Sequence, residues 1–246
     1  MDDRPLSQWK IKNKQKIIAR KAWMMAILFS ILTLLPFFGN TCLAGSWWLS
    51  FVAFFLTLAG IVTALIFGSR SRKMKKLLNR EQLIAQWQLD RESLKSFADE
   101  NFRIQQNRNK VLLRITGVFF ALVTIIFLFF LDKDERLFFL GIMFSVFLIV
   151  LAFALLMPHW YRYCNKKGNG AVLIGKKYLY LNGTFHNWDF PMSRFEKAEE
   201  TVTPFRGIIL AYRYTDRTGS HRCELKIPVP VNVDIKMLIR QIKGFK

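Results

Sequence analysis

The sequence predicts an α-helical membrane protein with four transmembrane helices in two hairpins, followed by a small cytoplasmic β-rich domain. Three observations lead to this prediction. Apolar residues make up 52% of the 246-residue chain and gather in four long runs. The formal net charge is +20. The last third of the chain shows strand and turn patterns without long apolar runs. A soluble protein seldom combines such an apolar content with so basic a balance.

Each of the four apolar runs is long enough to cross a bilayer, for which a helix needs about 20 residues. None of them contains Asp, Glu, Lys, Arg or His, and they comprise residues 22–38, 47–68, 115–131 and 137–157. Buried helices of a soluble core would not show four uncharged stretches of this length. The first run follows a basic segment, as a signal peptide would. The sequence after it, FFGNTCLAG, has no clear small-x-small cleavage pattern, so we expect a retained helix.

The distribution of Lys and Arg predicts the orientation of the helices. Seven basic residues precede the first run, none lies in residues 39–46, and eleven lie in residues 69–110. The connection DKDER between the third and fourth runs has two basic and three acidic residues. The region after the fourth run is basic again. We therefore expect both termini and the central segment to be cytoplasmic, with two short loops on the outside.

These patterns divide the chain into five segments. They are a basic cytoplasmic N-terminus (1–21), a transmembrane hairpin (22–68), a cytoplasmic helical linker (69–110), a second transmembrane hairpin (111–157) and a β domain (165–246). Within the linker, the alternation in EQLIAQWQL predicts a short strand. Asp90 is expected to cap a helix that continues into the third run. The linker aromatics Trp87 and Phe97 either pack on the β domain or the membrane surface, or face a protein partner.

The β domain is predicted from short alternating stretches separated by turns. The expected strands are residues 171–175, 177–181, 184–188, 194–203, 206–215 and 220–229. Asn182-Gly183 is a strong two-residue hairpin signal, because both residues accept a positive φ. This turn accounts for the Asn-Gly-Thr sequon without a modification. At the C-terminal end, Ile235, Leu238, Ile239 and Ile242 follow the spacing of an amphipathic helix.

Several of these stretches resemble known bacterial sequences. The pattern I-G-x-x-Y-L-Y-L-N-G-x-F-H-x-W and the strand exit I-P-V-P-V-N are similar to bacterial pleckstrin-homology-like (PH-like) domains of membrane proteins. The segment E-x-L-I-A-Q-W-x-L-D-R-E-S-L is similar to a group of bacterial four-helix integral membrane proteins. The resemblance implies a PH-like barrel closed by a C-terminal helix, and a location in the bacterial inner (plasma) membrane. It carries no catalytic signature.

The sequence offers two hypotheses for function. In the first, a non-enzymatic membrane protein presents the PH-like domain to a protein or to anionic lipid. In the second, the chain is a component of a membrane transport or enzyme complex. The apolar runs lack the ionisable residues that transporters keep inside the membrane, which favours the first hypothesis. The candidate lipid contacts are Lys166, Lys167, Lys176 and Lys177, which alternatively form a solvated basic flank.

No cofactor or metal is expected, because phosphate loops, nucleophile elbows and zinc-binding spacings are absent from the sequence. The alternative is a metal site built from His186, Asp189 and His221. The spacing of Cys42, Cys164 and Cys223 supports neither a metal site nor a redox motif. Nucleic acid is an unlikely partner, because no nucleic-acid-binding motif accompanies the basic runs.

Overall fold

The computed structural model describes residues 9, 11–38, 45–190, 192–216 and 219–244. Its helices are α1 (Lys14–Leu34), α2 (Trp47–Leu78), α3 (Arg91–Phe130), α4 (Lys133–Lys166) and α5 (Ile235–Lys243), with a short 3-10 turn, η2 (Leu35–Phe37), after α1. Its strands are β1 (Leu83–Gln88), β2 (Ala171–Gly175), β3 (Tyr178–Leu181), β4 (Thr184–Asn187), β5 (Ser193–Thr201), β6 (Gly207–Asp216) and β7 (Gly219–Pro228).

The helices α1 to α4 carry the four apolar runs and are long and apolar enough to cross a membrane. Their outward side chains include Phe129, Phe130 and Leu137, each at least 80% exposed. An apolar surface of this extent is incompatible with water and fits the interior of a bilayer. Four such helices indicate a multi-pass membrane protein. Helix α2 continues ten residues beyond Gly68. As expected, α3 begins at Arg91, well before its apolar run.

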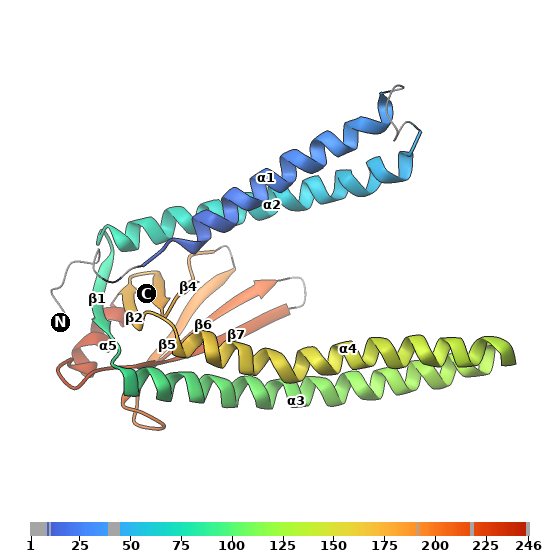
Figure 1. Ribbon diagram of the computed structural model, residues 1–246. Coiled ribbons are helices and arrows are strands. Elements are labelled where there is room, and N and C mark those ends of the chain that lie inside the picture. The colour runs from blue at the N-terminus through green and yellow to red at the C-terminus, as the bar shows by residue number, and fades with distance from the viewer. Residues whose placement is uncertain (1–8, 10, 39–44, 191, 217–218, 245–246) are drawn as a thin grey trace.

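The four long helices form two hairpins, which extend from the β domain in the same general direction and splay apart (Figure 1). In the α1–α2 hairpin the helices touch through small residues: a Cβ added at Gly60 would lie 3.0 Å from the Cβ of Ala26. Ser50 also donates a hydrogen bond to the Thr33 carbonyl at 2.8 Å. Small residues allow this close approach of membrane helices.

The α3–α4 hairpin is held by aromatic rings between its apolar runs and by polar contacts at the end nearer the β domain. Phe127 stacks on Phe139 with ring centroids 5.4 Å apart. Nearer the β domain, the Asn109 amide donates to the Ala154 carbonyl at 3.0 Å.

The strands form two antiparallel sheets, and the expected closed barrel is not formed. Sheet A has the order β1-β2-β3-β4 and sheet B the order β5-β6-β7. In the described residues β4 and β5 share no ladder, because the chain turns away after Asn187 before β5 begins at Ser193. The other pair of edge strands, β1 and β7, is joined by a side chain instead of a ladder. The Trp87 indole N–H donates to the Pro228 carbonyl at 3.0 Å.

Strand β1 joins the sheet from the segment between the two hairpins. It pairs antiparallel with β2, from Leu83 opposite Gly175 to Gln88 opposite Ala171. The Leu89 amide extends this pairing by donating to the Gly170 carbonyl at 2.8 Å. The α3–α4 hairpin is thus an insertion between two neighbouring antiparallel strands.

The turn between β3 and β4 adopts the predicted conformation. Asn182 has φ 46° and Gly183 has φ 93°, as a two-residue hairpin requires. The Asn182 side chain also accepts a hydrogen bond from the Gly170 amide at 3.0 Å and donates to the Asn165 carbonyl at 2.8 Å. This one asparagine therefore ties the turn to the end of α4 and to the start of β2.

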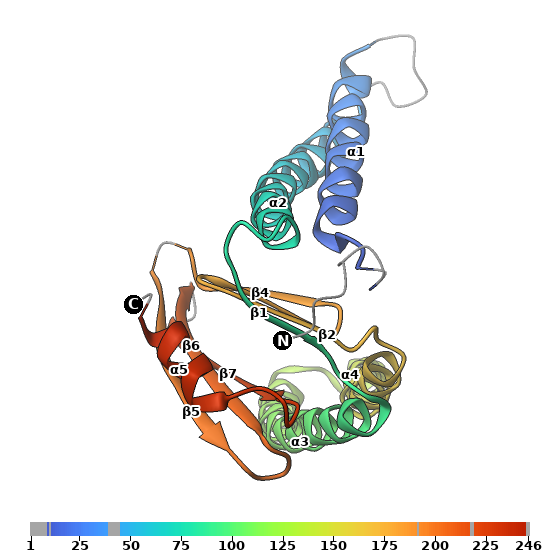
Figure 2. The ribbon, with the colours of Figure 1, turned by 90° about the vertical axis from the view of Figure 1, so that its left-hand side faces the viewer.

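Sheet A is buried on both faces, which explains its almost continuous apolar strands. One face packs on sheet B and α5 through residues such as Val172 and Leu179. The other face, with Leu173 and Tyr180, packs on Trp9 and on the C-terminal end of α2. Figure 2 shows sheet A below α1–α2, with α3–α4 on the opposite side. As predicted, α5 is amphipathic and buries Ile235, Leu238 and Ile242.

Candidate functional site

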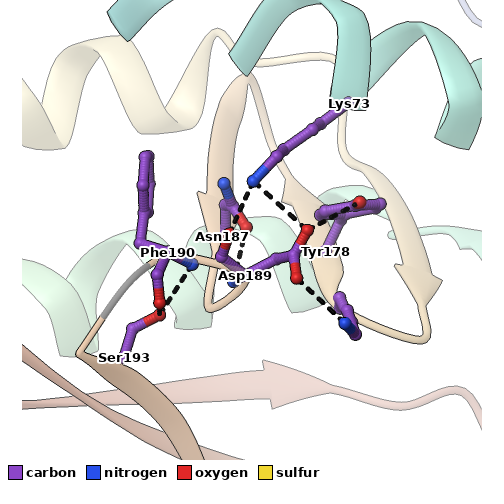
Figure 3. Close-up of polar contacts among 7 residues, drawn as sticks. Lys73, Tyr178, Asn187, Asp189, Phe190 and Ser193 are labelled. Carbon is purple, nitrogen blue, oxygen red and sulfur yellow. Dashed lines mark hydrogen bonds and ion pairs between the residues drawn. The ribbon is translucent and has the colours of Figure 1, made fainter. Parts of the chain in front are cut away.

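Asp189, just after β4, lies at the centre of a polar junction between α2 and sheet A (Figure 3). The Lys73 ammonium donates to the Asp189 carbonyl at 2.6 Å and pairs with its carboxylate at 3.2 Å. The Lys177 ammonium pairs with the same carboxylate at 2.9 Å, and the Tyr178 hydroxyl donates to it at 3.3 Å. One carboxylate therefore links a transmembrane helix to the β2–β3 turn.

The ionised form of this carboxylate is stabilised by its neighbours. Burial alone would raise the pKa of Asp189, but hydrogen bonds from Lys177 and Lys73 outweigh it and hold the pKa below its usual range. The pKa of Tyr178 rises to about 12, chiefly through desolvation and secondly through the charge of Asp189. At neutral pH the junction is a carboxylate, two ammonium groups and a neutral phenol.

The loop that carries Asp189 is held by short-range hydrogen bonds. The Asp189 amide donates to the Asn187 side chain at 2.8 Å, and the Phe190 amide donates to the Ser193 hydroxyl at 2.8 Å. The Phe190 ring lies under the Lys73 ammonium, 4.9 Å from the ring centroid. The carboxylate is therefore presented on a preorganised loop (Figure 3).

Beside this junction lies a groove of about 300 Å³, called here the basic groove. Its charged lining consists of Lys176, Lys177 and Arg194 against the single carboxylate of Asp189. Ser193 also lines the groove, and the rest of the lining is aromatic or apolar: Trp188, Phe190, Phe195 and Ile242. With three basic side chains and one carboxylate, the groove carries an excess of positive charge beside apolar side chains. This combination suits an amphiphilic anion.

The four lysines predicted as lipid contacts do not form one cluster. Lys166 pairs with Asp99 at 3.1 Å, and Lys167 donates to the Tyr163 hydroxyl at the end of α4. Lys176 and Lys177 line the basic groove instead. The two pairs lie at opposite ends of β2, whose five residues span about 17 Å. The structure thus brings one of the four lysines, Lys177, together with Lys73 at Asp189, and places Lys176 beside it in the groove.

Trp87 and Phe97, the candidate partner-facing residues, lie in the core between the sheets. Trp87 is 3% exposed and Phe97 7% exposed. Both belong to the cluster formed with Val172, Ile208 and Leu238. Their placement agrees with the alternative in which they pack on the β domain.

The three residues of the alternative metal site have other partners. Asp189 is occupied by two lysines, and the His186 Nδ1 lies 3.3 Å from the Tyr212 hydroxyl. The His221 ring lies against Tyr214, 5.4 Å between centroids. In the part of the chain that the structure describes, no three His, Cys, Asp or Glu side chains are grouped so that they could hold a metal ion. Cys164 and Cys223 are free thiols, and Cys42 lies outside the described residues.

We expect His186 to make the stability of the β domain dependent on pH. Desolvation, and secondly the charge of Arg70, lower its pKa from 6.5 to about 4. Below pH 6.5 the unfolded chain gains a proton that the folded chain does not bind, so the free energy of unfolding falls as the pH drops toward 4. The full loss is about 3 kcal/mol. We expect the melting temperature of the full-length protein in detergent to decrease over this range.

The matched variants for this test are His186→Gln and His221→Gln. The first removes the titrating group and is expected to flatten the decrease, whereas the second is expected to retain it. An equally steep decrease in His186→Gln would assign the effect to other groups.

Comparisons with protein-family models, with curated proteins and with solved structures find no match for this chain. The proposals below therefore rest on its own residues.

Sequence patterns alone did not single out Lys73 and Arg194 as parts of the site. A signal for Lys73 was present, because Arg70, Lys73, Met74 and Leu77 share one helix face at i, i+3, i+4 and i+7. In the structure this face docks on sheet A, where Met74 and Leu77 are fully buried and Arg70 donates to the Phe185 carbonyl at 2.7 Å. Arg194 had no such local signal.

Proposed function

We propose that this protein is a non-enzymatic integral membrane protein whose cytoplasmic PH-like domain binds anionic lipid head groups through the basic groove. The observation that carries this proposal is the excess of cations above an apolar groove, next to a transmembrane helix. Phospholipids combine the two matching features, an anionic phosphate and an apolar body. Anionic lipids attract basic residues near the membrane surface.

The position of the groove along α2 supports this ligand. Lys73 follows Gly68, the last residue of the second apolar run, by five residues, which is about 8 Å of helix. The polar layer of a bilayer extends roughly 5–8 Å beyond the hydrocarbon core. Because Lys177 pairs with the same carboxylate as Lys73, the groove begins close to this layer.

The charge distribution along the sequence supports the proposed orientation. The basic segments adjoin the ends of the helices that meet the β domain, so we place both termini and that domain in the cytoplasm. We place the protein in the bacterial inner membrane, a location supported by the resemblance of its sequence motifs alone. In this orientation the basic groove lies on the side of the membrane whose leaflet is richer in anionic lipid.

The test uses the purified full-length protein in maltoside micelles. We expect dioctanoyl phosphatidylglycerol to raise the melting temperature at low salt and dioctanoyl phosphatidylcholine to have little effect, because a ligand that binds the folded state stabilises it. The variant Lys176→Gln/Arg194→Gln is expected to lose most of this rise.

The matched control is Arg91→Gln/Lys95→Gln, which removes two exposed charges at the start of α3, outside the groove. It should retain the response to phosphatidylglycerol. Equal responses to the two lipids, or an equal loss in the control variant, would contradict lipid binding by the groove and favour a protein partner.

A further inference from the structure

A second polar cavity, of about 520 Å³, lies between the cytoplasmic ends of α3–α4 and the β domain. Its α3 wall extends from Phe97 to Asn109, which is about 18 Å of helix. The upper end is lined by Arg108, Met157 and Pro158, next to the apolar runs of α3 and α4. The cavity therefore starts near the membrane boundary and extends into the cytoplasmic part of the protein. It is separate from the basic groove.

Three polar side chains form a stripe along this α3 wall. Asn101, Gln105 and Arg108 are spaced i, i+4 and i+7, so they lie on one face of the helix. Their side chains make no hydrogen bond or ion pair with any other residue that the structure describes. Asn101 and Gln105 are half-buried. Half-buried amides without protein partners need water or a ligand to satisfy them.

The opposite wall does not neutralise this stripe. Lys226 on β7 is paired with the buried Glu100 at 2.6 Å, and Glu224 is paired with Arg222 at 2.6 Å. Arg108 is the lining cation that no described carboxylate pairs with. The cavity consequently has a positive charge at its membrane end and amide groups farther in.

A guanidinium followed by two amides along a helix matches the donors that a phosphate ester requires. Arginine recognises phosphate oxygens with parallel N–H donors. Asparagine and glutamine both donate and accept, so they suit the hydroxyl and ester oxygens of a glycerol or similar alcohol. Ile104 and Met157 add apolar surface to the same cavity.

We infer that this cavity binds a phosphate ester, with the phosphate at Arg108 and its alcohol portion at Gln105 and Asn101. The ligand is either the head group of a phospholipid from the adjacent leaflet or a soluble phosphate ester. Both present the same chemistry to these three side chains.

Binding is measured by calorimetry with the full-length protein in maltoside micelles, using dioctanoyl phosphatidylglycerol, glycerol 3-phosphate and inorganic phosphate. We expect Arg108→Gln to weaken binding at least about tenfold, as for the loss of a charge-assisted hydrogen bond. Arg114→Gln removes the same charge six residues along α3, outside the cavity, and should bind like the wild type. Melting temperatures without ligand show whether both variants are folded.

The three compounds distinguish a phospholipid head group from a soluble phosphate ester as the ligand. Binding of phosphatidylglycerol alone identifies a lipid head group, and equal binding of glycerol 3-phosphate identifies a soluble ester. Either result supports the phosphate site. Wild-type affinity in Arg108→Gln, an equal loss in Arg114→Gln, or no binding of any of the three compounds overturns it. All of these proteins, including the reference, carry Lys176→Gln/Arg194→Gln, which removes two cations of the basic groove. Binding of phosphatidylglycerol then reports on the cavity, and failure of this test is distinguishable from failure of the proposal for the groove.

A second measurement locates the ligand independently of charge. Cys223 lines the cavity, whereas Cys164 is exposed on α4 outside it. In a Cys42→Ala background, a saturating phosphate ester is expected to slow maleimide labelling of Cys223 several-fold and to leave Cys164 unchanged. An unchanged labelling rate of Cys223 at saturation would exclude the cavity as the binding site.

Discussion

The fragment of residues 165–246 is expected not to form a stable fold when it is expressed alone. It lacks β1, which pairs with β2 along its length and contributes Trp87 to the core. It also lacks Met74 and Leu77, which cover the other face of sheet A and are at most 1% exposed. Burial of a large apolar side chain contributes about 2 kcal/mol, so these three residues account for about 6 kcal/mol. A whole domain is stable by only about 5–15 kcal/mol.

A rearranged chain should restore this fold without the membrane helices. Gln88 lies opposite Ala171, and the Leu89 amide bonds to Gly170, so β1 and β2 end side by side. A short glycine turn can therefore join residues 69–90 to residues 168–246 and replace the α3–α4 insertion. We expect this chimera to give a dispersed NMR spectrum and cooperative thermal unfolding, and the fragment of residues 165–246 to give neither.

The contribution of α2 is tested by a shorter chimera that begins at residue 80. It keeps β1 but lacks Met74 and Leu77, and we expect it to melt at a lower temperature than the chimera that begins at residue 69. If residues 165–246 alone unfold cooperatively at the temperature of the longer chimera, β1 and α2 are dispensable for the domain.

Replacement of Trp87 by alanine should destabilise the β domain by about 4 kcal/mol, as for other buried aromatic side chains. The indole is 3% exposed, and its N–H bridges the open seam between β1 and β7 by bonding to the Pro228 carbonyl. Trp87→Phe retains most of the apolar volume and loses this hydrogen bond, so we expect a cost of about 1–2 kcal/mol. Urea unfolding of the longer chimera measures both.

A matched control for the full-length protein is Trp160→Ala. Trp160 is 61% exposed on α4, so its removal leaves no internal cavity. We expect its melting temperature to remain near the wild-type value, while that of Trp87→Ala falls by several degrees. Equal decreases in the two variants would indicate that the seam contact does not stabilise the domain.

Local features of this protein were predictable from its sequence because local interactions determine them. A membrane helix satisfies its backbone hydrogen bonds within its own segment, so an uncharged apolar run such as residues 137–157 is sufficient to predict it. The Asn182-Gly183 turn depends on the φ preferences of two neighbouring residues. The continuation of α3 from Arg91 into its apolar run follows from a start signal at Asp90 and from the absence of proline in residues 91–130.

Tertiary structure decided that the two sheets do not close into a barrel. It also decided which residues line the basic groove and the polar cavity. Asp189 meets Lys73 across 116 residues, and no spacing in the sequence indicates that pair. Lys166 and Lys176 are ten residues apart in sequence, but β2 separates them spatially. Asn101, Gln105 and Arg108 share one face of a helix by their spacing alone, but the walls that make this face part of a cavity come from α4, β3, β4 and β7.

The sequence alone therefore determined the four long apolar helices, the Asn182-Gly183 turn and the amphipathic C-terminal helix. Each of these depends on residues within one segment. Only the tertiary structure decided that β1 belongs to sheet A, that the barrel stays open at Trp87, and which cations gather around Asp189. The physical reason is that strand pairing and helix docking depend on the free energy of contacts between distant segments. The residues adjacent to a strand or helix in sequence do not specify which distant segment it pairs with or docks on.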